Sequence, residues 1–316
     1  YALFKRPSTF LYRWRSFSGI RLVQYTFMFS SVPMLFYGII DYNLEIFSII
    51  ILTILALYSG FFATLLWNDI TDVEIDKISH PSRPLPMGNI SRGKMFLIAL
   101  LFSTSTFLLS FLVNIWCFIF VLCSALFVAV HNKYLKKIIK LPAYSELFTP
   151  LQWVIVPIFG FLAVNVGFYP LDYENIQLLV MLILFTYLAD AGHDLPEGIA
   201  DAEGDSTYGV KTYATTFGVK NAARISFLMF LLSGVIGYLL FLTSILSIVF
   251  LILFTVVWLY TMYHSSILLR ADESKMKKIG KIVGQNTFRY FWLTFDIIFL
   301  DLFIQLFLVN VRTDII

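Results

Sequence analysis

Nine long apolar runs constrain what this chain can fold into more than any other feature of the sequence. Each run is close to the ~20 residues that an α-helix needs to cross the ~30 Å hydrocarbon core of a bilayer. Lipid offers the backbone no hydrogen-bond partners, so runs of this length predict helices rather than open strands. The sequence therefore predicts an all-α, polytopic membrane protein with nine transmembrane helices, at about 22–40, 46–67, 94–112, 115–131, 147–167, 175–193, 222–241, 243–263 and 288–309.

Composition supports this class. Of the 316 residues, 59% are hydrophobic and only 14% are charged, whereas a soluble domain carries about 25% charged residues. The net charge of +3 says little by itself, and we expect no nucleic-acid partner. Basic and aromatic residues alternate over residues 1–20, which favours an arm lying on the membrane surface. Residues 1–316 are expected to form a single transmembrane domain embedded in the lipid bilayer.

The distribution of basic residues predicts the orientation. The N-terminal arm, the loops at 68–93, 131–146, 194–221 and 264–287, and the adjoining helix ends hold 22 of the 23 Lys and Arg residues. The opposite side holds only Arg312. By the positive-inside rule, the basic side is cytoplasmic and the C-terminus lies outside, which requires an odd number of spans.

An acidic stretch follows the second apolar run. Asn68, Asp72 and Asp76 recur at every fourth residue, so a helix would place all three on one face. A basic, proline-rich segment, SRPLPMG, follows and contains Arg83. Oxygen-bearing side chains aligned at a membrane edge are costly unless something cationic binds them.

A second acidic stretch follows the sixth run. Five carboxylates fall at steps of 4, 3, 4 and 4 along one helical stripe: Asp190, Asp194, Glu197, Asp201 and Asp205. A single Asp at the centre of a spanning helix costs about 2.5–3.5 kcal/mol, so the stripe must face water, protein or metal. Pro196 is expected to kink the helix, because the carbonyl of Gly192 loses its usual amide partner.

The two stretches suggest a magnesium site. Both follow an even-numbered run on the same side, and a parallel pseudo-repeat of helices around a central cavity would bring them face to face. Hard oxygen ligands suit Mg2+, which shares its remaining positions with water and phosphates. Basic residues in adjoining loops would complete a diphosphate site: Arg83, Lys136, Lys137, Lys140 and Lys211. The alternative is that the acids merely pair with nearby Lys and Arg residues.

The motifs resemble those of the UbiA-type intramembrane prenyltransferases. Asn68 to Asp76 matches the family's NDxxDxxxD motif, and SRPLPMG resembles the RPLPxG that usually follows it. Asp194, the DAEGD of residues 201–205 and the GVKT of residues 209–212 resemble the family's second motif. The YLKK of residues 134–137 looks like its basic loop between the fourth and fifth helices. The resemblance covers nearly the whole chain in order and spacing.

The resemblance implies residue roles, with loops on the cytoplasmic side covering a central cavity. Mg2+ ions bridging to an isoprenyl diphosphate donor would be held by Asn68, Asp72, Asp76, Asp194, Asp201 and Asp205. Lys136 and Lys211, with Arg83 or Lys137, would bind the diphosphate. Asp72, Asp201 and Lys136 are the residues we expect to be catalytic. The family's N-terminal arginine corresponds to Arg21, although alignment with Gln24 fits equally well. The implied reaction transfers the isoprenyl group to a hydrophobic acceptor.

Departures from the family pattern bear on the acceptor. Phe61 stands where members that use an aromatic acid carry arginine, and His193 stands where tyrosine is frequent. Both departures argue against a hydroxybenzoate-like acceptor. The run HPSRPLPMGNIS and the DAEGD motif resemble those of members that serve lipid, quinone or carotenoid acceptors, including archaeal glycerol-ether lipid synthesis. His193 could accept a proton from the incoming nucleophile or serve a structural role.

Two other functions fit parts of the pattern. A terpene cyclase would use the same diphosphate ionisation without an acceptor. A divalent-cation transporter would need acidic residues deeper in the spans, whereas those found here cluster at one edge.

Overall fold

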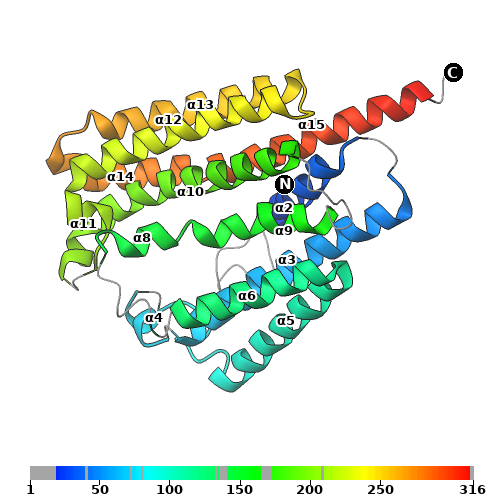
Figure 1. Cartoon of the computed structure of the whole chain (residues 1–316). Coiled ribbons are helices and arrows are strands. Elements are labelled where there is room, and N and C mark those ends of the chain that lie inside the picture. The colour runs from blue at the N-terminus through cyan, green and yellow to red at the C-terminus, as the bar shows by residue number, and fades with distance from the viewer. Residues whose placement is uncertain are drawn as a thin grey trace.

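A computed structural model describes residues 19–39, 42–71, 73–79, 81–131, 134, 141–164, 173–207 and 210–313. Within these ranges the chain is helical and contains no strand, which confirms the predicted all-α class (Figure 1). The helices are α2 (Gly19–Tyr37), α3 (Leu44–Thr71), α4 (Val73–Ser79), α5 (Arg92–Val113), α6 (Ile115–Val130), α8 (Tyr144–Phe148), α9 (Leu151–Val164), α10 (Tyr173–Thr207), α11 (Tyr213–Phe217), α12 (Val219–Thr243), α13 (Ile248–Leu269), α14 (Glu273–Thr287) and α15 (Tyr290–Thr313).

Every predicted apolar run overlaps one of these helices. Seven helical stretches in the described part of the chain are long and apolar enough to cross a membrane: Leu44–Thr71, Arg92–Val113, Glu146–Val164, Tyr173–Thr207, Val219–Thr243, Ile248–Leu269 and Glu273–Leu308. The apolar helix α6 is shorter, at 16 residues, and α2 falls outside that group. The polytopic class is therefore confirmed, while a count of nine spans stays a prediction.

Two segments predicted as loops contain helix. Helix α10 continues from its apolar half through residues 194–207, and α14 occupies most of the segment 264–287. Both segments are polar, so hydropathy alone placed them outside any span. They are helical because α14 packs along α10 with its small and apolar face, which buries Met276, Gly280 and Val283.

Short turns join two pairs of neighbouring helices, α5 with α6 and α12 with α13, into antiparallel hairpins. Asn114 joins α5 to α6: its side chain accepts a hydrogen bond from the Cys117 amide at 2.8 Å and donates one to the Leu162 carbonyl at 2.9 Å. At the α12–α13 turn, the fully buried carboxylate of Asp301 on α15 accepts the amide hydrogen bonds of Ser247 and Phe250. These bonds satisfy the free amides at the start of each second helix.

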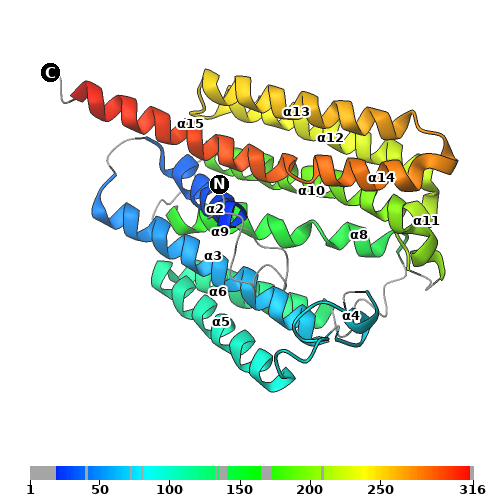
Figure 2. The ribbon, with the colours of Figure 1, turned by 180° about the vertical axis from the view of Figure 1, so that it is seen from behind.

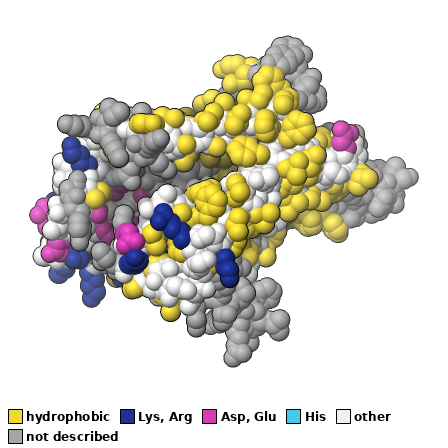
Figure 3. All heavy atoms as spheres, turned by 90° about the horizontal axis from the view of Figure 1, so that it is seen from below, with side chains coloured by type: hydrophobic (Ala, Val, Ile, Leu, Met, Phe, Trp, Pro, Cys, Tyr) yellow, Lys and Arg dark blue, Asp and Glu magenta, His cyan; other side chains and the backbone are white. Residues whose placement is uncertain are grey.

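Aromatic side chains fill the centre of the bundle. The Tyr25 ring of α2 lies 5.1 Å from Phe61 of α3, 5.9 Å from Trp153 of α9 and 5.3 Å from Trp292 of α15, measured between centroids. Figure 2 shows α2 running between α15 and α3. The outer helices instead expose large apolar side chains, as expected of surfaces facing lipid (Figure 3).

Polar elements gather at one end of the bundle. The short helices α4 and α11 lie there, with the C-terminal ends of α3 and α10 and the beginning of α14 (Figure 1). Figure 3 shows the visible charged side chains mainly at this end. The two acidic stretches therefore share one end, as predicted, and the assignment of that end to the cytoplasm stays a prediction.

Candidate functional site

The first acidic cluster is closed by the proline-rich loop. Nη1 of Arg83 lies 2.7 Å from both carboxylate oxygens of Asp76 and 3.7 Å from Oδ1 of Asp69. The side chains of Asp69 and Asp76 are only 2% and 6% exposed, so this cation neutralises two buried carboxylates. Asn68 is exposed, and Asp72 lies outside the described residues.

The loop folds back because its backbone bonds to itself. The Met87 amide donates to the Arg83 carbonyl at 3.0 Å, and the Asn89 amide donates to the Pro84 carbonyl at 2.9 Å. Gly88 has a φ of 74°, which favours glycine. Leu85 is buried and anchors the loop. Arg83, which was predicted to bind diphosphate, thus forms an ion pair with Asp76, which was predicted to bind metal. For Asp76 in this conformation, the alternative prediction of an acid paired with a nearby basic residue holds.

The second acidic cluster lies on one continuous helix. Helix α10 spans all five predicted carboxylate positions, so the stripe expected from their spacing is present. The carbonyl of Gly192, which Pro196 deprives of an amide, accepts a hydrogen bond from the Ser226 hydroxyl of α12 at 2.6 Å. A neighbouring helix therefore replaces the bond that proline removes.

The inner end of the stripe is buried more deeply than its outer end. Asp190 and His193 are 5% and 6% exposed, Asp194 and Asp205 are half-buried, and Asp201 is exposed. The stripe therefore runs from the interior of the bundle to its polar end. Asp190, Glu197 and Glu146 all act electrostatically on Asp194. So many acids around one carboxylate are costly without a compensating cation or proton.

The residues of this stripe fit a divalent cation. Oδ2 of Asp194 is buried and has no hydrogen-bond partner among the described residues. Nδ1 of His193 lies 3.2 Å from Oδ1 of Asp194. In the described part of the chain, no lysine or arginine makes an ion pair with Asp190 or Asp194. Unpartnered, buried oxygens on an acidic stripe are what a metal ion would satisfy.

Close packing fixes the end of α10. A Cβ atom on Gly280 of α14 would lie 2.7 Å from the Pro196 carbonyl oxygen, and one on Gly198 would lie 2.2 Å from Oε1 of Glu146. Glu146, buried at the start of the α8–α9 segment, also accepts a hydrogen bond from the amide of Tyr213 in α11. Glu146 was not singled out from sequence, where it is one acid beside an apolar run with no motif around it.

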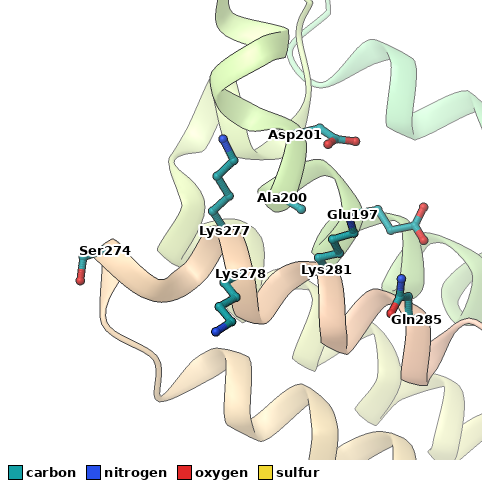
Figure 4. Close-up of a pocket in the computed structure, with 8 residues that line it drawn as sticks. All are labelled: Glu197, Ala200, Asp201, Ser274, Lys277, Lys278, Lys281 and Gln285. Atoms are coloured by element: carbon teal, nitrogen blue, oxygen red, sulfur yellow. The ribbon is translucent and has the colours of Figure 1, made fainter. Parts of the chain in front are cut away.

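A polar groove runs between α10 and α14. It has a volume of about 620 Å³ and is lined by Glu197, Ala200, Asp201, Ser274, Lys277, Lys278, Lys281 and Gln285. Figure 4 shows the lysines on α14 and the carboxylates on α10, with Lys277 reaching toward α10. Nζ of Lys277 pairs with Glu203 at 2.7 Å. Asp201 thus lines the same groove as three lysines of α14. From the sequence, these lysines served only to predict which side of the membrane their segment faces.

The remaining predicted residues are placed as follows. Arg21 lies with its guanidinium carbon 5.2 Å from the Phe288 ring and 5.0 Å from the Trp292 ring. Phe288 also lies 4.8 Å from the His193 ring, so Arg21 belongs to the neighbourhood of the second cluster. Lys211 is exposed and precedes Thr212, which caps α11. Lys136 and Lys137 lie outside the described residues.

The structure thus brings together two local groups. Asp69, Asp76 and Arg83 form one, and Asp190, His193 and Asp194 form the other. The first group lies where α3 ends and α4 follows, at the polar end, and the second lies further into the bundle on the buried part of α10. No described contact joins them, and their predicted face-to-face arrangement around a central cavity stays a prediction.

Known proteins resemble the chain in sequence. A model of the UbiA prenyltransferase family matches residues 28–292. The digeranylgeranylglyceryl phosphate synthase of Saccharolobus solfataricus is 31% identical over 194 residues, which are 61% of this chain and 64% of that protein. Its counterpart from Thermococcus sibiricus is 30% identical and matches 50% of this chain and 52% of its own. The synthase of Methanobrevibacter smithii is 27% identical over 238 residues, which are 73% of this chain and 81% of that protein. The chain thus spans about half to four fifths of these relatives.

Solved structures share the fold. A UbiA homolog from Aeropyrum pernix K1 has a TM-score of 0.62 at 18% identity, over 84% of this chain and 97% of that one. A digeranylgeranylglyceryl phosphate synthase structure has a TM-score of 0.61 at 22% identity, and the match covers 87% of this chain and 92% of that one. A UbiA homolog from Archaeoglobus fulgidus, bound to DMAPP and Mg2+, has a TM-score of 0.52 at 15% identity. The match covers 86% of this chain and 96% of that one.

Proposed function

The chain belongs to the UbiA prenyltransferase family, and on that premise we propose that it prenylates a lipid acceptor bearing a glyceryl phosphate. The donor would be an isoprenyl diphosphate, and the acceptor a glycerol-ether lipid precursor. Relatives of about 30% identity named digeranylgeranylglyceryl phosphate synthase support this acceptor class. The absence of arginine at Phe61 agrees with an acceptor other than an aromatic acid.

The observation that carries the proposal is the acidic stripe of α10, which runs from a buried, unpartnered Asp194 to the polar end. Asp194, Asp201 and Asp205 would hold Mg2+, together with Asn68, Asp72 and Asp76 of the first stretch. Bound Mg2+ would supply positive charge that stabilises the departing diphosphate. The described residues fit this role because carboxylate oxygens are hard ligands, and Asp194 makes no ion pair with a lysine or arginine among the described residues.

The chain's own residues would do the rest. Arg83 and Lys211, with Lys136 and Lys137, would donate hydrogen bonds to the diphosphate oxygens. For Arg83 to do so, it must release Asp76, which would free that carboxylate for metal at the same time. The aromatic cluster around Tyr25 would keep water from the allylic carbon and present ring faces to developing positive charge. The donor C–O bond breaks, the acceptor hydroxyl oxygen bonds to that carbon, and the hydroxyl proton leaves to solvent.

The test is product analysis of purified protein in lipid nanodiscs. We would incubate it with Mg2+, a panel of isoprenyl diphosphates, and acceptors that differ only in the presence of the glyceryl phosphate. We expect a prenylated ether lipid and one diphosphate per product, with neither formed from donor alone. A cyclised hydrocarbon from donor alone would instead establish a terpene cyclase. Mg2+ flux into proteoliposomes without any transfer would establish a transporter.

A further inference from the structure

We propose that Asp190, His193 and Asp194 form a divalent-cation site with a nitrogen ligand, which makes this chain able to hold a transition metal such as Mn2+. The site lies about two to three helical turns from Asp201 along α10, toward the interior of the bundle. It differs from the oxygen-only set expected for Mg2+, although it shares Asp194 with that set.

The three side chains converge from one face of α10. At positions i, i+3 and i+4 they are neighbours on a helix. A nitrogen of His193 and one oxygen of each carboxylate all lie within 4.8 Å of one another. Side-chain adjustment alone is therefore enough to bring the three to one ion. A carboxylate and a histidine at i and i+3 is also the spacing that metal sites inside helical bundles use.

The imidazole has no competing partner. Both ring nitrogens of His193 are buried and lack a hydrogen bond to any described residue. The 3.2 Å contact between Nδ1 and Oδ1 of Asp194 does not have hydrogen-bond geometry. The centroid of the imidazole ring lies 4.8 Å from that of the Phe288 ring. This packing holds the imidazole in position but offers its nitrogens no hydrogen bond. A buried imidazole that lies close to two carboxylates and makes no hydrogen bond to any described residue is an observation independent of the acidic stripe.

The donor set selects the metal. Mg2+ takes oxygen ligands almost exclusively, whereas imidazole nitrogen suits Mn2+, Fe2+ and Zn2+ better. Three protein ligands leave coordination positions open, as in sites that also bind a substrate. Phe230 packs beside Gly192, and Asp190 and His193 are buried, while the Asp194 side chain keeps 18% exposure. The residues therefore fit a partly open transition-metal site at the inner end of the acidic stripe.

The test measures binding, so it stands or fails separately from prenyl transfer. Purified full-length protein in nanodiscs would be loaded with Mn2+ alone, without donor or acceptor, and studied by electron spin-echo envelope modulation. We expect modulation from a directly coordinated imidazole nitrogen in the unsubstituted protein. His193→Asn should abolish it. His264→Asn should preserve it, because His264 lies on α13, hydrogen-bonded to Asn286 and apart from the cluster.

A second variant covers the case in which His193→Asn misfolds. Asp190→Asn keeps the imidazole and should weaken Mn2+ binding on the order of tenfold, because a ligand loses its charge. Circular dichroism and gel filtration would confirm that each variant is folded. The proposal is overturned if Mn2+ bound to the unsubstituted protein shows no nitrogen coupling, or if coupling survives in folded His193→Asn protein. Transfer activity, measured separately, bears on neither outcome.

Discussion

Ser226 and Pro196 act as a pair at the scale of single residues. Proline removes the amide that would bond the Gly192 carbonyl, and the Ser226 hydroxyl takes its place at 2.6 Å. The loss of the amide is predictable from sequence, but the replacement is not, because Ser226 lies on a different helix 34 residues away. This bond keeps α10 helical between its apolar half and its acidic end.

Ser226→Ala should therefore lower the free energy of unfolding by about 1–2 kcal/mol, because a buried carbonyl loses the hydroxyl that donates to it. In a Pro196→Ala protein, the restored amide of residue 196 can donate to the Gly192 carbonyl. Ser226→Ala should then lower the free energy of unfolding by less than half as much. Reversible unfolding in mixed micelles measures this double-mutant cycle. Equal costs in both backgrounds would show that Ser226 does not compensate for the proline.

Arg83 and Asp76 form a second residue-scale pair, with side chains 16% and 6% exposed. Arg83→Leu should lower the free energy of unfolding by roughly 2–3 kcal/mol. This loss is below the usual range for breaking a buried ion pair, because the Arg83 side chain keeps some exposure. Adding Asp76→Leu should recover much of that loss. Lys77→Leu is the control, since its pair with Glu74 is exposed and should matter by less than about 0.5 kcal/mol. Similar losses for Arg83→Leu and Lys77→Leu would contradict the account of the closed loop.

At the scale of elements, α14 supports the acidic end of α10. Each predicted apolar run became a helix because length and hydropathy are enough to specify one in lipid. Hydropathy placed both α14 and the polar end of α10 in loops, because these segments are polar and pack on each other. The carboxylate spacing predicted helix for the polar end of α10, whereas no pattern predicted α14. Gly280 permits that packing by bringing α14 against the Pro196 carbonyl.

Gly280→Ala should lower the melting temperature, with a loss of about 1–3 kcal/mol from overpacking against backbone that cannot yield. Gly204→Ala is the matched control: it also lies in a helix, at the end of α10, but nothing lies within 4 Å of an added Cβ. That variant should be neutral or slightly stabilising. A Gly280→Ala protein as stable as the control would show that the α10–α14 contact is loose.

At the scale of the whole molecule, charge and hydropathy separate along the bundle. The sequence predicts that acidic and basic loops cluster at one end, and the visible charged side chains of the described residues lie mainly at the end where α3 and α10 finish. The side of the membrane that this end faces stays a prediction. The local groups Asp69–Asp76–Arg83 and Asp190–His193–Asp194 depend on side-chain geometry, so spacing alone could not reveal them.

The orientation can be tested by labelling. In a Cys123→Ser background, Ser274→Cys should react with a membrane-impermeant maleimide only from the cytoplasmic side. Thr243→Cys should react only from the opposite side. Both positions are exposed, at opposite ends of the bundle, whereas the remaining Cys117 is buried. Labelling of both from the same side would exclude the predicted topology.

The central claim is that the acidic stripe of α10 holds the metal that drives prenyl transfer. The most direct measurement compares the rate of prenylated-lipid formation, at saturating Mg2+, in Asp201→Asn and in Asp272→Asn. Asp272 is an exposed acid at the same end of the molecule, outside the groove and the stripe. We predict a loss on the order of a hundredfold or more for Asp201→Asn and an unchanged rate for Asp272→Asn. A folded Asp201→Asn protein with the full rate would contradict the account.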